Sequence, residues 1–386
     1  MAHTLRGLDG AAFAEIPCVT RPGSVEAVNE AGYLNANPDV RRVNMSARDH
    51  FAQCGQREGR LQFVNEAEVG RERERKLARL RFRGPASPRA EGAPTDHLTP
   101  AMREAFRIPD APPVSSNEYG GHLVDLIRAN PDKLFLDVGA GLRHVYFSNV
   151  VNTEIYPSLS TDVVCLGEDL PFESDQFDYV LSFAVLEHTR RPWDVAREMC
   201  RVLKPGGQLW VDYPFLQPVH GYPHHYFNAT PMGSASLFEP WCDIQTLEIF
   251  DNNHPIRALT WILELWRNGL SETDAASFEA MRVADLLVSS ADAQMALPFC
   301  RDLDSTVRRT IAAGSSLIAV KRPGAVGPSP SAAREMELVR ENAGLHEAIE
   351  TIRASTSWRV TAPLRALGRL IMRTGGGFVR QGRDAA

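Results

Sequence analysis

A short glycine-containing segment follows the first strongly apolar run of the chain's central part. Residues 136–141 read Leu-Asp-Val-Gly-Ala-Gly, and glycines at positions 139 and 141 would let the main chain approach a ligand closely. Glu154 lies 17 residues after Asp137, at the end of the next apolar run. A carboxylate there can accept hydrogen bonds from the hydroxyls of a ribose. These residues predict a binding site for a nucleoside-containing ligand.

Four histidines are candidates for proton transfer. His220, His224 and His225 lie in one aromatic-rich segment, and His188 precedes them. Histidine exchanges a proton near neutral pH, so one of these side chains is expected to act as a general base for a hydroxyl substrate or to bind it. The alternative is that they only fix the loop by hydrogen bonds. Their spacing also permits a metal site, but the sequence places no carboxylate or cysteine to complete it, so no metal is predicted.

Apolar runs that alternate with amphipathic stretches would position these side chains. Such alternation is typical of βαβ units on a mostly parallel sheet. Helices are expected at 120–129 and 193–203, and the sequence Lys-Pro-Gly-Gly at 204–207 would end the second helix. The expected strands are 134–138, 149–154, 162–166, 179–182, 208–213 and 316–321.

Four segments of this unit, 136–141, 169–172, 177–188 and 202–207, occur in one order at compatible spacings. Together they resemble the class I S-adenosylmethionine-dependent methyltransferases, in their type 11 form. The resemblance covers roughly residues 118–240 and the late strand at 316–321. It implies an enzyme that uses S-adenosylmethionine. It also implies an α/β, Rossmann-like fold with a seven-stranded, mostly parallel sheet whose last strand is antiparallel.

The same resemblance implies which residues bind the cofactor. Asp137, Gly139 and Gly141 would surround its methionine part, and Glu154 would hold its ribose. Further contacts with the cofactor are expected from two alanines, Ala140 and Ala184.

Two positions depart from the pattern of this family. Arg143 stands where a third glycine is common, so the loop either curves differently or uses the guanidinium to meet a carboxylate. Leu166 stands where an acid commonly binds the adenine amine. Glu168 or Asp169 would then substitute for that acid, unless both are turn or capping carboxylates.

The segments before the predicted catalytic domain differ in composition. Residues 1–64 are expected to form a small helical N-terminal module. Residues 65–83 alternate positive and negative charges at helical spacing, which is typical of a solvated helix that acts as a spacer. Residues 84–111 are rich in proline and predict a linker without regular elements. The catalytic domain is expected over 112–323.

A second linker at 324–332 precedes a predicted helical C-terminal tail at 333–386. A short heptad-like pattern at its start predicts a coiled coil, which would form a homo-oligomer or dock on its own chain. The rest of the tail is basic and amphipathic. It would make a peripheral contact with an anionic membrane surface, or else remain solvated or bound to a partner.

Two flanking segments indicate which kind of molecule would accept the methyl group. Residues 33–60, with the pattern Y-L-x-x-N-P-D-V, and residues 354–364 are similar to accessory segments of bacterial glycan-biosynthesis enzymes. This resemblance implies O-methylation of a sugar hydroxyl on a surface glycan or its precursor, with glycosyltransferases as partners. The alternatives are a small-metabolite or lipid acceptor, or a non-catalytic scaffold of glycan assembly. A nicotinamide dehydrogenase is disfavoured because His144 replaces the last glycine of G-x-G-x-x-G.

Composition limits the setting and the partners. The net charge of -6 gives no overall attraction to nucleic acid. The six cysteines form no C-x-x-C pair, and neither a signal peptide nor a membrane-spanning run is apparent. A cytoplasmic protein is expected, with the inner face of the membrane as a second possibility through the tail.

Overall fold

The computed structural model describes residues 12–84, 86–87, 89–108, 115, 118–221, 224–268 and 314–323, with four isolated positions at 272, 276, 292 and 295. The predicted linker at 324–332 and the predicted coiled coil and basic tail at 333–386 lie outside the described residues. The chain divides into two compact units. Helix α5 (Pro100–Ala105) groups with the C-terminal residues, and every other described element belongs to the first unit.

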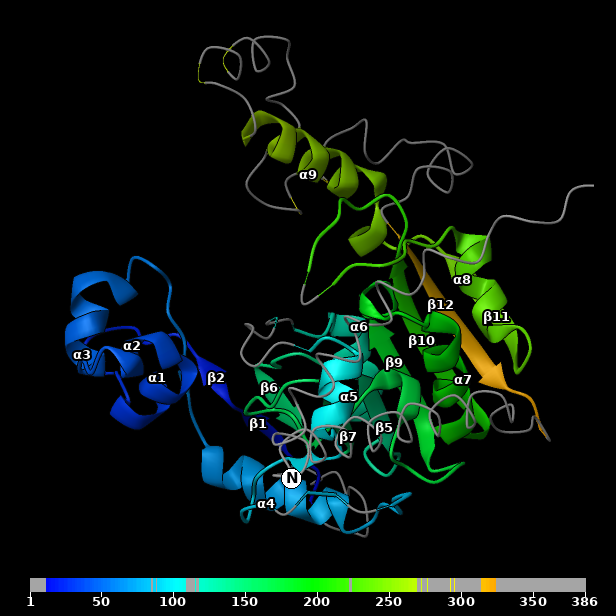
Figure 1. Ribbon diagram of the computed structural model, residues 1–386, viewed down its shortest axis with the longest axis horizontal. Helices are drawn as coiled ribbons and strands as arrows, with labels where there is room; N and C mark the ends of the chain where they lie inside the picture. The colour runs from blue at the N-terminus through cyan, green and yellow to red at the C-terminus, as the bar shows by residue number, and fades with distance from the viewer. Residues whose placement is uncertain are drawn as a thin grey trace, which may run out of the picture. The chain divides into compact units, whose positions relative to one another are not determined.

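An eight-stranded sheet forms the centre of the first unit (Figure 1). The strand order is β11-β12-β10-β9-β5-β7-β8-β4, and the pairs from β10 to β4 are all parallel. Only β12 pairs antiparallel, with β10 and β11. The strands are β4 (Thr95–Asp96), β5 (Phe135–Val138), β7 (Val150–Glu154), β8 (Val163–Val164), β9 (Phe177–Phe183), β10 (Leu203–Pro214), β11 (Cys242–Glu248) and β12 (Gly314–Lys321).

This sheet confirms the Rossmann-like α/β class and the antiparallel late strand. All six expected strands are present, and β11 is the seventh. The prediction of seven strands was one short, because β4 adds an eighth beside β8. It comes from the stretch predicted to be a linker, where Thr95 N–H donates to the carbonyl of Asp162 at 2.9 Å. A proline-rich segment can supply a two-residue strand at a sheet edge, where few main-chain donors are needed.

Alternating residues of the strands face two separate layers of the core. Leu136, Val180 and Leu209 pack with helices α7 and α8, whereas Phe135 and Leu181 pack with α6. Because successive side chains of a strand point to opposite faces, the buried strands are apolar throughout. The helices of this part are α6 (Gly121–Ala129), α7 (Pro192–Val202), α8 (Pro231–Phe238) and α9 (Pro255–Asn268), with short helical turns at Gly167–Asp169, Leu186–His188 and Asp251–Asn253.

The N-terminal segment contains short helices and also contributes strands. Its helices are α1 (Glu30–Ala36), α2 (Pro38–Arg42) and α3 (Ala47–His50), followed by a wide turn at Phe51–Gly55. They enclose a small core of their own around Tyr33 and Phe51. Strand β2 (Val19–Thr20) pairs with β3 (Gln62–Phe63), while β1 (Glu15–Pro17) pairs antiparallel with β6 (Val145–Phe147). The start of the chain is therefore hydrogen-bonded to the predicted catalytic domain.

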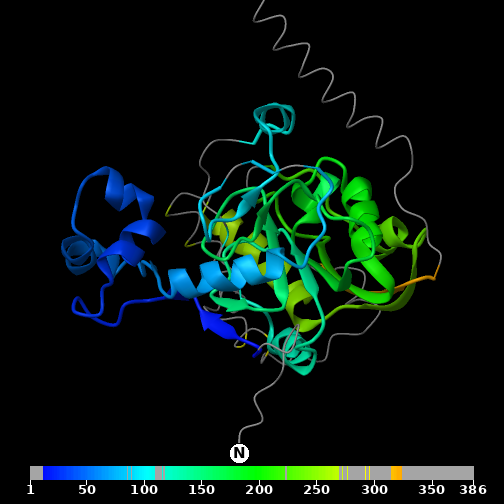
Figure 2. The same ribbon diagram turned by 90° about the horizontal axis from the view of Figure 1, so that it is seen from below.

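Helix α4 (Glu66–Leu77) lies in the segment that alternates in charge, in front of the strands in the view of Figure 2. The expectation that this helix is solvated was wrong, because Arg73 and Lys76 are 3% and 1% exposed. Lys76 Nζ lies 2.7 Å from a carboxylate oxygen of Asp162, and Arg73 Nε lies 3.5 Å from the other. Tyr146 also donates a hydrogen bond to Asp162. Charge alternation at helical spacing cannot distinguish a solvated face from one that meets a buried acid.

Among the described residues, no helix combines the length and apolar character needed to cross a membrane.

Replacing Lys76 by methionine should destabilise the fold by about 3 kcal/mol. The substitution keeps the apolar stem but leaves the Asp162 carboxylate with Arg73 as its only nearby cation among the described residues, and a buried charge that loses its partner costs about 3–5 kcal/mol. Urea unfolding of the full chain measures the change. The control is Arg71→Ala on the same helix, at an exposed position. It should change the free energy of unfolding by less than about 0.5 kcal/mol. Equal losses in the two variants would contradict the buried ion pair.

Candidate functional site

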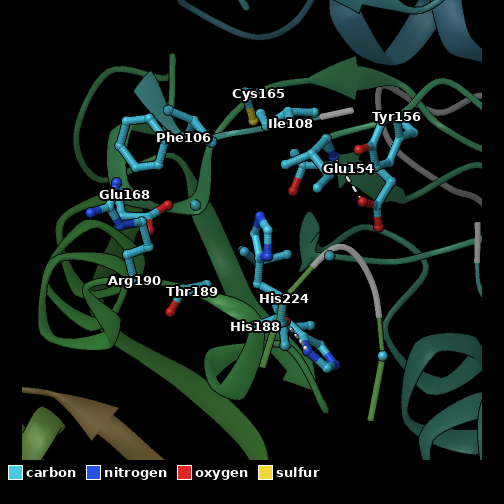
Figure 3. Close-up of a pocket in the computed structure, with 18 of the residues that line it drawn as sticks. Phe106, Ile108, Glu154, Tyr156, Cys165, Glu168, His188, Thr189, Arg190 and His224 are labelled. Carbon is cyan, nitrogen blue, oxygen red and sulfur yellow. Dashed lines mark hydrogen bonds between the residues drawn. The ribbon is translucent and has the colours of Figure 1, made fainter. Parts of the chain in front are cut away.

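A cavity of about 540 Å³ lies at the carboxyl ends of β5, β7, β8 and β9 (Figure 3). The carboxyl ends of neighbouring parallel strands meet at one edge of a sheet, and the loops that leave them enclose a ligand site. Of the predicted site residues, the cavity is lined by Gly139, Glu154, Glu168, Ala184, His188, His220 and His224. The structure places Asp137, Ala140, Gly141, Asp169 and His225 outside this lining.

The glycine turn after β5 is required by contacts within the chain itself. Gly139 has a φ of +71°, and a Cβ added there would lie 2.5 Å from Cγ2 of Val185. Gly141 has a φ of +65°, and its Cβ would lie 2.6 Å from the carbonyl oxygen of Ser115. Between them Ala140 is buried, with its N–H bonded to the carbonyl of Thr153. Only Gly139 therefore exposes main chain to the cavity, while Gly141 and Ala140 shape the turn.

Asp137 lies behind the turn and is fully buried. One of its carboxylate oxygens accepts hydrogen bonds from Arg143 Nη2 at 2.8 Å, from Arg143 Nε at 3.0 Å and from the Tyr119 hydroxyl at 2.5 Å. The Arg143 guanidinium also lies 4.2 Å from the centre of the Tyr119 ring. Of the two explanations for Arg143, the structure supports the one in which the guanidinium meets a carboxylate. Asp137 and Arg143 hold the turn in place from behind and do not line the cavity.

Glu154 ends β7 with its carboxylate in the cavity wall. One oxygen accepts the N–H of Gly141 at 3.0 Å and the other accepts the N–H of Ile155 at 2.8 Å. Burial raises the pKa of Glu154, and the two main-chain hydrogen bonds oppose that rise. Each carboxylate oxygen can accept more than one hydrogen bond, so acceptor sites remain for the hydroxyls of a ligand.

The two acids after β8 are placed differently. Glu168 lines the cavity, whereas Asp169 accepts a hydrogen bond from Arg83 at 3.0 Å outside it. Of the two acids, only Glu168 therefore remains a candidate for the expected contact with adenine. Burial raises the pKa of Glu168 from 4.5 to about 7. Leu166 presents an apolar wall beside it.

Ala184 follows β9 and reaches the cavity with a strained main chain. Its φ of +55° is unusual for a residue with a Cβ, and its N–H is held by the carbonyl of Asp212 at 3.0 Å. The sequence reasoning missed several cavity residues, among them Phe106 and Ile108. Both lie in the stretch predicted to be a linker, where nothing but their apolar character could have indicated them.

The four histidines fall into three different environments. His188 and His220 lie close together at the cavity wall, with ring centres 5.2 Å apart. Burial lowers the pKa of His188 to about 4 and also lowers the pKa of His220. The His224 ring lines the cavity (Figure 3), and its Nε2 donates to the carbonyl of Arg107 at 3.2 Å. His225 accepts the N–H of His220 at Nδ1 and bonds Asn228 at Nε2, so it fixes the loop.

Glu187 is a site residue that the sequence reasoning did not single out. It is fully buried between His188 and His220, with one carboxylate oxygen 3.6 Å from His188 Nε2 and 3.8 Å from His220 Nε2. Burial raises the pKa of Glu187 to about 8. The expectation that no carboxylate accompanies the histidines was wrong. In the sequence, the position of Glu187 next to His188 and directly after a predicted strand could have indicated this carboxylate.

Replacing Glu168 by glutamine should change stability in a pH-dependent manner. With its pKa raised to about 7, the folded protein retains a proton that the unfolded chain releases near pH 4.5. The protonated Glu168 therefore contributes to the free energy of unfolding of the wild-type protein at low pH, and this contribution is lost as the pH rises from about 4.5 through 7. A glutamine has no such proton to release, so the variant does not show this loss. Urea unfolding at pH 5 and pH 8 should show the variant gaining about 1–3 kcal/mol relative to wild type at the higher pH. The control Glu173→Gln, at an exposed position, should show no such gain. A difference independent of pH would contradict the buried acid.

Comparison with known proteins identifies part of this region. Residues 136–211 match the family described as "Methyltransferase domain". An uncharacterized methyltransferase of Mycobacterium tuberculosis is 46% identical over 57 residues, which cover 14% of this chain and 22% of that protein. One from Mycobacterium leprae is 39% identical over 69 residues, which cover 18% of this chain and 26% of that protein. The matched part of this chain thus spans about a quarter of the length of these relatives.

Two solved structures illustrate the level of structural likeness. A putative methyltransferase from Bacillus halodurans aligns with a TM-score of 0.31 and 17% identity, over 53% of this chain and all of that one. Phosphoethanolamine N-methyltransferase 2 of Haemonchus contortus, in complex with S-adenosyl-L-methionine, aligns with a TM-score of 0.29 and 17% identity, over 52% of each chain. These scores are too low to bear on substrate. Residues 136–211, which contain the glycine turn, Glu154 and the Glu187–His188 pair, are therefore the part of this chain that matches a methyltransferase domain.

Proposed function

We propose that the whole protein is an S-adenosylmethionine-dependent O-methyltransferase whose acceptor is a sugar hydroxyl of a bacterial surface glycan or its precursor. The observation that carries the cofactor assignment is the meeting of Gly139 and the Glu154 carboxylate in one cavity at the carboxyl ends of parallel strands. When bound, the cofactor supplies an activated methyl group on a sulfonium.

The residues of the cavity fit this cofactor. Glu154 is pre-positioned by two main-chain N–H groups and retains acceptor sites for ribose hydroxyls. Leu166 and Glu168 would meet the adenine, with a protonated Glu168 able to donate a hydrogen bond. Gly139 and Ala184 would lie along the methionine part. The volume of about 540 Å³ falls in the range of roughly 300–1,000 Å³ that is usual for small-molecule sites.

His224 is the proposed general base for the acceptor. Because its Nε2 donates to a carbonyl, its Nδ1 carries the lone pair in the neutral ring, and this atom has no partner among the described residues. The acceptor hydroxyl would pass its proton to Nδ1 of His224 as its oxygen takes the methyl group. Alignment of acceptor and donor inside an enclosed cavity would supply most of the remaining acceleration.

The choice of a sugar acceptor rests on the flanking segments. The segment that contains Tyr33 forms a compact helical unit with its own core, which suits an accessory module. The tail at 333–386 is the basis for proposing glycosyltransferase partners, a homo-oligomer and a cytoplasmic location at the inner membrane face. Removal of the N-terminal segments cannot separate their role from catalysis, because β1, α4 and β4 all bond to the catalytic part. The full chain must be tested.

Cofactor binding should depend on Glu154 and not on Asp169. Calorimetric titration of the full chain with S-adenosylhomocysteine should give one site, and Glu154→Gln should weaken it by about 10- to 100-fold, because hydrogen bonds to a charged acceptor contribute about 1.5–3 kcal/mol. Asp169→Asn is the matched control and should leave affinity unchanged, since its carboxylate lies outside the cavity. Absence of binding by the wild-type protein would remove the cofactor assignment.

Methyl transfer should require His224 and a glycan acceptor. With radiolabelled S-adenosylmethionine, label should appear in oligosaccharide or lipid-linked sugar, and His224→Asn should lower turnover by about 10²- to 10⁴-fold without weakening S-adenosylhomocysteine binding. His144→Gln is the control, because that ring bonds exposed Glu118 and lies outside the cavity. If the label enters only small metabolites or simple lipids, those molecules and not a glycan are the acceptors. Cofactor binding without transfer to any acceptor would favour a scaffold.

A further inference from the structure

We infer that Glu187, His188 and His220 form a binding site for a divalent metal ion of the zinc, cobalt or manganese type. The first observation is the isolation of Glu187. Its side chain is fully buried, and neither carboxylate oxygen has a hydrogen-bond donor among the described residues. Buried carboxylates are normally paired with cations, given donors or bound to metals. The described residues provide no cationic side chain within ion-pair distance of Glu187, apart from the two imidazoles if they were protonated.

The second observation is the orientation of the imidazoles. Nδ1 of His188 lies 2.8 Å from the carbonyl oxygen of His224, and Nδ1 of His220 lies 2.7 Å from that of Pro218. A carbonyl can only accept, so each Nδ1 carries the hydrogen and each Nε2 of the neutral ring carries a lone pair. Main-chain carbonyls commonly fix metal-binding histidines in this manner.

The three ligand atoms converge at distances that suit an ion. The Nε2 atoms lie 3.6 and 3.8 Å from the same Glu187 oxygen, too far for hydrogen bonds, and all three atoms lie within 4.8 Å of one another. For bonds of about 2.1 Å, tetrahedral ligands are about 3.4 Å apart. Contraction by a few tenths of an ångström would bring both distances from the Glu187 oxygen to the imidazoles to that value. Two lone pairs and a carboxylate facing one another without a proton would otherwise repel.

A second group of potential metal ligands differs from the Glu187 group, because its side chains bond to one another and to neighbouring residues. His50, Cys54 and Glu58 also lie within reach of one ion. Both nitrogens of His50 already have partners, the Tyr33 hydroxyl at 2.9 Å and the Cys54 thiol at 3.4 Å. Glu58 pairs with Arg60 at 2.8 Å. That group is satisfied without a metal, whereas the Glu187 group is not.

The donor set points to the role of the ion. Two imidazoles and one carboxylate are the ligands of catalytic zinc sites, which keep a further position open. His188 and His220 both line the cavity, so the open position would face the acceptor. If the proposed function holds, an acceptor hydroxyl bound there would become more acidic and would give its proton to His224 more readily.

Cobalt titration tests the site without using activity. The untagged full chain, treated with chelator, should bind one equivalent of Co²⁺ with d–d absorption in the visible range. Glu187→Gln and His220→Asn should each weaken binding by on the order of 100-fold, since even outer-shell changes cost 10- to 100-fold. Two controls should bind as wild type. His144→Gln alters a ring that bonds Glu118 away from the cavity, and Cys54→Ser alters the other ligand group.

Three results would overturn the site: no cobalt band in the wild-type protein, unchanged affinity in folded Glu187→Gln and His220→Asn variants, or loss of binding in Cys54→Ser alone. The first would mean that a proton on Glu187 satisfies the cluster. Circular dichroism establishes which variants are folded, and the loop variant His220→Asn keeps the test valid if the buried Glu187→Gln does not fold. Titration of the metal-free protein with S-adenosylhomocysteine is independent of this result, so failure of the metal site and failure of the proposed function are distinguishable.

Discussion

A carboxylate removed from water needs a cation or hydrogen-bond donors, and this requirement shapes the protein at three places. Asp137, Asp162 and Glu187 are all fully buried. Asp162 is neutralised by Lys76 and Arg73 from α4, which fixes that helix to the sheet. Asp137 is neutralised by Arg143, which fixes the turn after β5. Glu187 has no such partner among the described residues, and for this reason it is the acid to which we assign a ligand from outside the chain.

Two of these acids, Asp137 and Glu187, support residues that line the cavity. The Asp137–Arg143 pair supports the cofactor wall from behind, so that Gly139 and Glu154 can face the ligand without carrying the strain of the turn. Glu187 lies where the loop after β10 brings His220 beside His188. In the proposed function, the cofactor would meet Gly139 and the acids Glu154 and Glu168, and the acceptor would meet the imidazoles. Such a division suits a transfer reaction in which one substrate is charged and the other must lose a proton.

The departures from the family pattern have a physical explanation in the fold. Arg143 occupies a position where glycine is common, but its side chain turns away from the ligand into a pair with Asp137 and onto the Tyr119 ring. In the proposed function, Leu166 would leave the adenine region apolar. Burial raises the pKa of Glu168 to about 7, so its carboxyl group would donate a hydrogen bond where the family commonly has an acceptor.

Sequence alone determined the alternation of strands and helices, the glycine turn and the acid that ends the second catalytic strand, because these depend on local periodicity and on the conformational freedom of glycine. It could not determine that α4 is buried, that the proline-rich segment adds β4, or that Glu187 lies between His188 and His220. The contacts of Lys76 with Asp162, of β4 with β8 and of Glu187 with His220 join residues 33 to 86 positions apart, and local composition carries no record of such contacts. Only the tertiary structure decided which charges are solvated and which are buried, because burial is a property of the packed whole.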